Sequence, residues 1–158
     1  MKKLIFTAVF ATLVSVAAFA DGGKKASTTT GEENVSYAVL TQFQDNFTDV
    51  SNVVWTVAPK SQKASFTKNN LNYTAYYDSV DQFYGLAQEV SFASVTKAVK
   101  SEIAKNYAGY NVQAVTRFEP NDGEEPVVYF IGLKNAKEDL VLTISPVDGQ
   151  ITNIDKVK

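Results

Sequence analysis

The spacing of apolar residues changes from a helical to a strand period early in the chain. Apolar side chains recur every three or four positions within residues 36–49, which predicts an amphipathic helix. These side chains are Val39, Leu40, Phe43 and Phe47. Asn34 or Ser36 can cap the first turn of this helix. Apolar and other residues then alternate through residues 53–57 until Pro59, so a strand is expected to follow the helix.

Three more strands are expected in the first half of the chain. Two strand-like runs, residues 63–68 and 71–77, flank the pair Asn69-Asn70. Asparagine tolerates positive φ, and this pair therefore predicts a tight turn between two strands of a hairpin. Residues 83–90 form the next strand-like run.

The same order of elements then starts again. Apolar residues spaced by three or four predict a second helix over residues 92–107. They are Phe92, Val95, Val99, Ile103 and Tyr107. Ser91 is a candidate cap, and Gly109 lies just past the end, where a left-handed residue is favoured. Four strand-like runs complete the chain, at residues 111–118, 127–134, 139–145 and 150–157.

The two series of elements match at fixed offsets. Residues 73–77 match residues 140–144 at an offset of 67, and Phe47 matches Tyr107 at an offset of 60. The difference of seven is about the length of an acidic, turn-rich loop at residues 120–126. The two halves share one order of helix and strands and differ by a single insertion at this loop, which predicts a tandem duplication. The two units would span about residues 36–90 and 92–157.

Several short aromatic motifs follow one another in a fixed order. F-x-x-x-F at Phe43 and Phe47 precedes V-x-W at Val53 and Trp55. The later motifs are Ala64-x-Phe66, the Tyr-rich strand 73–77, Tyr107-Ala108-Gly109-Tyr110 and Val147-Asp148-Gly149. In this order the motifs resemble the PepSY-like, β-lactamase-inhibitor-like proteins that some Gram-negative bacteria export. The resemblance covers roughly residues 36–157.

This resemblance implies an α+β fold and a role without catalysis. The expected architecture is two α-β4 units that share a curved antiparallel sheet, with both helices on one face (BLIP-like, PepSY-like). The expected role is binding or inhibition of another protein, and no inhibitory residues carry over to this sequence. Two positions depart from the family pattern. Thr48 stands where a proline is expected, and Asp81-Gln82 stands where Asp-Gly is expected.

Residues 1–20 have the three parts of a secretory signal peptide. Lys2 and Lys3 form the positive region, an uncharged apolar stretch follows, and Ala18-Phe19-Ala20 supplies the small-x-small cleavage pattern. The apolar stretch is shorter than the roughly 20 residues that a membrane-spanning helix needs. We therefore expect cleavage, no membrane insertion afterwards, and a periplasmic or secreted protein of a Gram-negative bacterium.

The segment after the signal peptide has a different composition from the rest of the chain. Residues 21–34, DGGKKASTTTGEEN, are small, polar or charged without an apolar period, which predicts a flexible leader. The folded domain is therefore expected over residues 35–158. The chain without its signal has 158 − 20 = 138 residues, a length that suits one domain or two small halves.

The composition excludes several classes of function. The chain has no cysteine and no histidine, which removes thiol nucleophiles, disulfides and the usual zinc ligand and general base. Without the two lysines of the signal, the net charge is 13 − 17 = −4. Arg117 is the only arginine, and nucleic-acid binding needs clustered Lys and Arg. We therefore predict no cofactor, no metal and no nucleic-acid partner.

Carboxylates are the only conventional acid–base groups in the chain. Asp78 and Asp81 bracket a turn, and three more acids (Asp122, Glu124 and Glu125) belong to the loop at 120–126. Turn aspartates usually accept hydrogen bonds from their own backbone, and loop acids are usually solvated. A glycosidase needs two carboxylates across a cleft, and calcium needs alternating oxygen ligands. We favour the structural interpretation and predict no catalytic residues.

The sheet face without helices carries unexpected apolar residues. If residues 73, 75 and 77 face the helices, Thr74 and Tyr76 face away from them. By the same alternation, Val128 and Phe130 face away in the second unit. A sheet face without helices is normally polar, and clustered apolar groups on a surface indicate a contact site. Tyr76, Thr74, Val128 and Phe130 are therefore the predicted partner surface, whereas Trp55 is expected in the core.

Three functions remain open from the sequence. The leading hypothesis is an exported, non-catalytic binding domain that recognises a protein or peptide of the envelope. It would inhibit or regulate an envelope protein such as a peptidase. The alternative is a structural or sensing domain that binds cell-wall peptide or glycan on the same aromatic residues. The third is a hydrolase that uses carboxylates. Loop 120–126 is the next candidate for the partner surface.

Overall fold

The computed structural model describes residues 29–121, 123 and 126–157. The signal peptide, residues 21–28 of the leader and the acids of loop 120–126 lie outside this part. The described chain is an α+β fold built on one antiparallel sheet whose nine strands are neighbours in sequence order. The strands are β1 (Thr29–Thr30), β2 (Ser51–Ala58), β3 (Ser61–Lys68), β4 (Leu71–Tyr77), β5 (Phe83–Glu89), β6 (Asn111–Pro120), β7 (Val128–Lys134), β8 (Asp139–Ile144) and β9 (Ile151–Val157).

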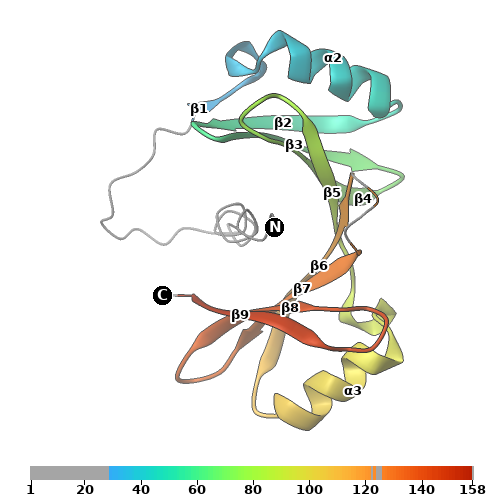
Figure 1. Cartoon of the computed structure of the whole chain (residues 1–158), viewed down its shortest axis with the longest axis vertical. Helices are drawn as coiled ribbons and strands as arrows, with labels where there is room; N and C mark the ends of the chain where they lie inside the picture. Colours follow the sequence, from blue (N-terminus) through green and yellow to red (C-terminus); the bar gives the residue numbers. More distant parts are fainter. Residues whose placement is uncertain (1–28, 122, 124–125, 158) are drawn as a thin grey trace.

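The sheet bends strongly, so that its two ends face one another across a concave side (Figure 1). Two helices, α2 (Tyr37–Asn46) and α3 (Lys97–Asn106), lie on the outer side of the bend. A short 3₁₀ turn precedes each helix: η2 (Glu32–Asn34) comes before α2, and η3 (Phe92–Ser94) comes before α3. The eight strands predicted from the period-two pattern are confirmed within a few residues at their ends.

The first strand and the first 3₁₀ turn come from the segment assigned to the leader. β1 pairs with β2 through Thr29 and Val57, and η2 follows directly. The expectation of a flexible leader up to residue 34 is therefore wrong for residues 29–34. The polar composition of residues 29–34 did not indicate that this segment pairs with the edge of the sheet.

Both helices are short and begin with a capping side chain. The Ser36 hydroxyl accepts a hydrogen bond from the Val39 backbone N–H (3.3 Å), and the Thr96 hydroxyl accepts one from Val99 N–H (3.4 Å). These bonds satisfy amide groups that lack a partner in the first helical turn. Ser36 is thus confirmed as one of the two proposed caps.

The second helix begins later than its apolar spacing suggested. Ser91 accepts a hydrogen bond from Ala93 N–H and caps the 3₁₀ turn, not the helix. Val95 then has an extended backbone, and the helix starts after Thr96. Gly109 is not among the described residues with positive φ, so the expected left-handed helix end is wrong.

The turn between β3 and β4 matches its prediction. Asn69 and Asn70 have φ angles of 53° and 61°, and Lys68 pairs directly with Leu71 on either side. Two consecutive residues with positive φ in a two-residue loop are the signature of the type I′ turn, whose twist matches that of the strands. The Asn-Asn hairpin is confirmed.

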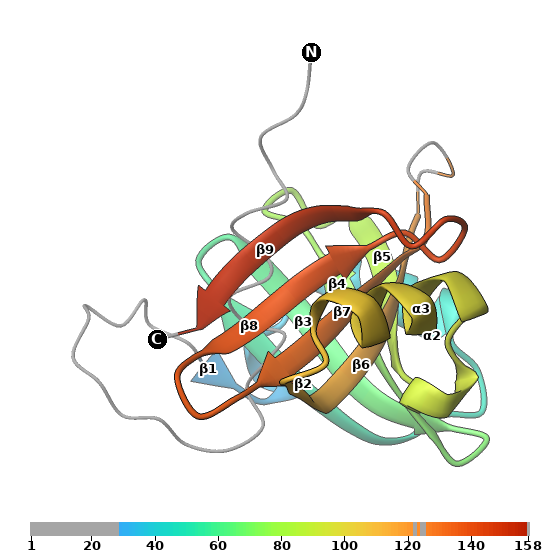
Figure 2. The same ribbon diagram turned by 90° about the horizontal axis from the view of Figure 1, so that it is seen from below.

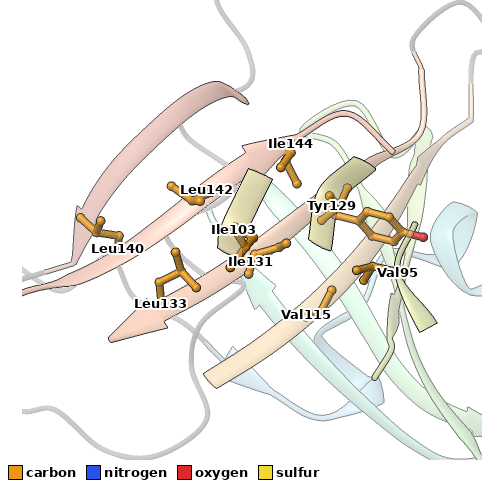
Figure 3. Packing of buried hydrophobic residues seen from close by; sticks show 10 residues of the cluster. Val95, Ile103, Val115, Tyr129, Ile131, Leu133, Leu140, Leu142 and Ile144 are labelled. Carbon is orange, nitrogen blue, oxygen red and sulfur yellow. The ribbon is translucent and has the colours of Figure 1, made fainter. Parts of the chain in front are cut away.

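Each helix packs on its own hydrophobic cluster. The cluster under α2 includes Val39, Phe43 and Trp55, and the rings of Phe43 and Trp55 meet edge to face at 5.0 Å. The cluster under α3 contains Val99 and Ile103 with side chains from β6, β7 and β8 (Figure 3). Figure 2 shows α3 lying over these strands. Trp55 is buried, which confirms its predicted place in the core.

One turn at the end of each half of the sheet is tied to the start of a helix. In the first half, the Gln62 side chain donates to Asp81 Oδ1 (2.7 Å) and accepts from Ser36 N–H (2.9 Å). In the second half, the Thr96 hydroxyl donates to the Pro146 carbonyl (2.8 Å). A Cβ on Gly149 would lie 2.8 Å from the carbonyl oxygen of Ala98. Both turns therefore dock closely on the first turn of their helix.

Candidate functional site

A third hydrophobic cluster lies on the sheet face that neither helix covers. Its buried members come from five successive strands, β4 to β8, and are Tyr76, Ala87, Phe118, Val128, Phe130 and Val141. The alternation of side chains explains this placement, because the neighbours of these residues belong to the clusters under the helices. Tyr77 and Ala75 beside Tyr76, and Ile131 and Tyr129 beside Phe130, are examples. We call this third group the concave cluster.

Aromatic rings form the centre of the concave cluster. The ring of Phe118 packs edge to face against Tyr76 (6.2 Å between centroids) and against Phe130 (6.3 Å). These distances and tilts are the preferred geometry of aromatic pairs. Gly85 allows this packing, because a Cβ there would lie 2.6 Å from Cζ of Phe118.

The sequence placed its partner-surface residues on the right face but misjudged their exposure. Tyr76, Val128 and Phe130 are only 4%, 8% and 5% exposed, so the expectation that they form an exposed patch is wrong. Strand alternation says which face a side chain occupies, whereas exposure depends on how far the sheet bends. Here the bend brings side chains from five strands against one another.

Thr74, the fourth residue of the predicted surface, is not a member of the concave cluster. It is half-buried and shares a hydrogen bond of 3.1 Å with the Ser65 hydroxyl on the neighbouring strand. Sequence reasoning missed the central residue, Phe118. The signal was present, because Phe118 stands three residues after Val115, and an odd spacing in a strand puts two side chains on opposite faces.

Polar groups border the cluster on the side of β2 and β3. Lys63 lies directly between Thr56 and Tyr76 in the register of three neighbouring strands. The residue is half-buried, and burial lowers the pKa of its ammonium group. Burial also raises the pKa of the Tyr76 hydroxyl well above its ordinary value. Both groups therefore lie in surroundings that disfavour charge.

The acids of the first turn have structural partners. Asp78 Oδ1 accepts hydrogen bonds from the N–H groups of Val80 and Gln82, both at 2.9 Å. The carboxylate of Asp81 accepts from Gln62, and its backbone carbonyl accepts from Gln42 (2.6 Å). These bonds close the turn and hold it against α2. Nothing in this arrangement resembles a pair of carboxylates facing across a cleft.

The described residues contain neither a cluster of metal ligands nor a helix that could span a membrane. No group of three or more acidic side chains gathers there as a metal site would require. Neither of the two ten-residue helices, nor any other helix in the described ranges, is long and apolar enough to cross a membrane.

Comparison with known proteins identifies the fold. No family model and no curated protein matches the chain. Among solved structures, a DUF2874 family protein from Bacteroides uniformis aligns with a TM-score of 0.70 at 18% identity, over 78% of this chain and 90% of that protein. A putative periplasmic protein from Bacteroides eggerthii aligns with a TM-score of 0.70 at 13% identity, over 77% and 88%.

A third structure is a BLIP-like protein from Bacteroides fragilis. It aligns with a TM-score of 0.66 at 14% identity, over 77% of this chain and 86% of that protein. At such low identity the alignments carry information about the fold and not about the ligand. The chain therefore has the α+β fold of the BLIP-like and DUF2874 structures.

Proposed function

We propose that the protein is an exported, non-catalytic binding domain that holds an envelope protein or peptide on the concave side of its sheet. By binding in this way, the protein would inhibit or regulate an enzyme such as a peptidase. The observation that carries the proposal is the concave cluster itself. Antiparallel sheets usually turn a polar face to water when no helix covers it, yet this face has an aromatic centre.

The border of the concave cluster is suited to contact with a partner. Half-buried polar residues (Thr56, Lys63 and Thr74) lie on the same face as the cluster, and Val54 is 57% exposed in the same cross-strand row as Thr74. Protein interfaces commonly combine an apolar centre with a polar rim. We place the contact on this rim and on the exposed side chain of Val54.

The names of similar structures support an exported binding protein. One is a putative periplasmic protein and another is BLIP-like. The signal pattern at residues 1–20 points to the same compartment. We also keep the PepSY-like resemblance as a proposal that rests on the order of the aromatic motifs.

The buried rings favour a protein or peptide over a glycan. Binding of sugars to aromatic side chains needs an exposed ring face, and the rings of Tyr76 and Phe130 are almost fully buried. The turn-bound carboxylates of Asp78 and Asp81 likewise give the hydrolase hypothesis no support. No observation favours the glycan-binding hypothesis or the hydrolase hypothesis.

We further infer that the fold consists of two copies of one unit. Each unit has a 3₁₀ turn, a ten-residue helix and four strands. Buried residues match at an offset of 60 up to the first strand and at 67 after loop 120–126. The matched pairs are Val35 and Val95, Val39 and Val99, Phe43 and Ile103, Trp55 and Val115, Ala75 and Leu142, and Tyr77 and Ile144. Superposition of the units, with that loop left over, tests the inference.

The absence of native cysteine permits a direct test of the binding face. Val54→Cys places a thiol on the concave side, and Gln44→Cys places one on an exposed position of α2 as a matched control. Each variant is expressed with its own signal sequence, labelled with a benzophenone maleimide and irradiated in an envelope extract.

Partner adducts are expected from position 54 and not from position 44. A specific adduct is one that excess unlabelled protein suppresses. Equal adducts at both positions, or adducts from α2 alone, would contradict binding on the concave side.

A further inference from the structure

Lys63 is a cation beside the concave cluster. It lies on β3, opposite Thr56 on β2 and opposite Tyr76 on β4. Directly opposed residues of antiparallel strands project to the same face. Because Tyr76 belongs to the concave cluster, the Lys63 side chain projects to the concave side as well.

The register neighbours of Lys63 carry hydroxyl groups. Its cross-strand neighbours are Thr56 and Tyr76, and its neighbours on the same face of β3 are Ser61 and Ser65. Within the described ranges, the three ion pairs involve Arg117, Lys134 and Lys156. No carboxylate of the described chain therefore neutralises the ammonium group of Lys63.

A cation in such a place is disfavoured until an anion joins it. Lys63 is half-buried, and this burial lowers its pKa. Loss of hydration costs free energy that a bound anion can offset, and hydroxyl groups nearby can donate further hydrogen bonds to an anion. Lysine side chains commonly bury the alkyl stem and keep the ammonium group in water, whereas the ammonium group of Lys63 is itself partly desolvated.

We propose that Lys63 binds a carboxylate of the peptide or protein partner, next to an apolar side chain of that partner packed towards the concave cluster. This inference rests on the proposed binding function and specifies the chemistry that the concave side recognises. The carboxylate is either an Asp or Glu side chain or a chain terminus. Because the whole protein is acidic, recognition depends on this local positive charge and not on net charge.

Three small peptides separate the two sources of the carboxylate. Acetyl-Phe with a free carboxylate represents a chain terminus, acetyl-Glu-Phe-amide represents an acidic side chain, and acetyl-Gln-Phe-amide is the neutral control. Each is titrated into the full mature protein, and binding is followed by NMR shifts of the backbone amides of Thr56, Lys63 and Tyr76.

At least one carboxylate peptide should bind ten-fold or more tightly than the neutral peptide, equivalent to about 1.4 kcal/mol. Lys63→Met should abolish this preference while the amide spectrum stays folded. Lys60→Met, which removes an equal charge from the exposed β2–β3 turn, should leave the preference unchanged. The peptide that binds more tightly identifies the source of the carboxylate.

Three results would overturn the inference. They are equal affinity for charged and neutral peptides, no shift at these three amides with any peptide, and a carboxylate preference that survives in Lys63→Met. If one of them occurs while Val54→Cys still gives partner adducts, the proposed binding face is retained and only the carboxylate site is refuted.

Discussion

Gly149→Ala tests the docking of the β8–β9 turn on α3. Gly149 has φ of +73°, a conformation that costs a residue with a Cβ about 1–2 kcal/mol. The new Cβ would also lie 2.8 Å from the carbonyl oxygen of Ala98 and 2.9 Å from its carbon. These are backbone atoms in the first turn of the helix, so they cannot move aside as a flexible side chain would.

The expected loss of stability combines these contributions. Overpacking against a fixed neighbour typically costs about 1–3 kcal/mol. If the turn moves away to relieve the clash, the hydrogen bond from Thr96 to the Pro146 carbonyl weakens, which costs about 1 kcal/mol. We expect Gly149→Ala to lower the free energy of unfolding by about 2–5 kcal/mol, a large part of the roughly 5–15 kcal/mol of a typical domain.

Urea denaturation followed by two signals measures the effect. Circular dichroism reports the whole sheet, and fluorescence of Trp55, the only tryptophan, reports the first half. If the halves unfold together, both midpoints should fall equally. If only circular dichroism changes, the halves unfold separately.

Gly109→Ala is the matched control. A Cβ at Gly109 meets nothing within 4 Å, and its φ is not in the left-handed range. The unfolding free energy should therefore stay the same or rise by about 0.4–1 kcal/mol, because alanine restricts the unfolded chain. A Gly149→Ala protein as stable as Gly109→Ala would refute close docking of the turn.

Three other changes have expected signs. Tyr77→Phe should raise the unfolding free energy by about 1 kcal/mol in urea denaturation, because the buried Tyr77 hydroxyl has no hydrogen-bond partner among the described residues; a loss of similar size would mean that the hydroxyl is satisfied. The double variant Tyr76→Ser, Phe130→Ser should lose at least about 3 kcal/mol, since both rings are buried; an unchanged melting temperature would contradict that burial. The ion pair with Lys156 lowers the pKa of Glu138, so the stabilisation by this pair is present above the ordinary Glu pKa and is lost as pH falls through the lowered value. The difference in unfolding free energy between the wild type and Glu138→Gln should therefore shrink on acidification. A difference that widens would exclude the ion pair as its cause.

Sequence periodicity predicted side-chain faces better than it predicted exposure. The alternation in β4 and β7 assigned Tyr76 and Phe130 to the helix-free face, where they lie. Their burial could not be predicted, because it depends on the curvature of a sheet formed by residues far apart in sequence. Curvature also gives Phe118 its central place, although the sequence analysis did not single it out.

Helix boundaries show a second reason why local patterns fall short. The apolar spacing from Phe92 to Tyr107 is continuous, yet the first turn is 3₁₀ and the α-helix starts after Thr96. Ser91 and Thr96 are both good caps, so the sequence offered two starts. The contact between Thr96 and the Pro146 carbonyl, 50 residues along the chain, favours the second.

The sequential order of the nine strands has a consequence for how the protein acquires its structure. Each strand pairs only with the strands directly before and after it, and most of these pairs are hairpins with short turns. Contacts within a hairpin close small loops and form sooner than contacts between distant segments, whereas the pairs β1–β2 and β5–β6 must close across a helix. A chain that emerges with its N-terminus first can therefore add each strand to a finished edge as it appears. The strands of the α2 half, β2 to β5, can therefore pair with one another before any residue of the α3 half has been made.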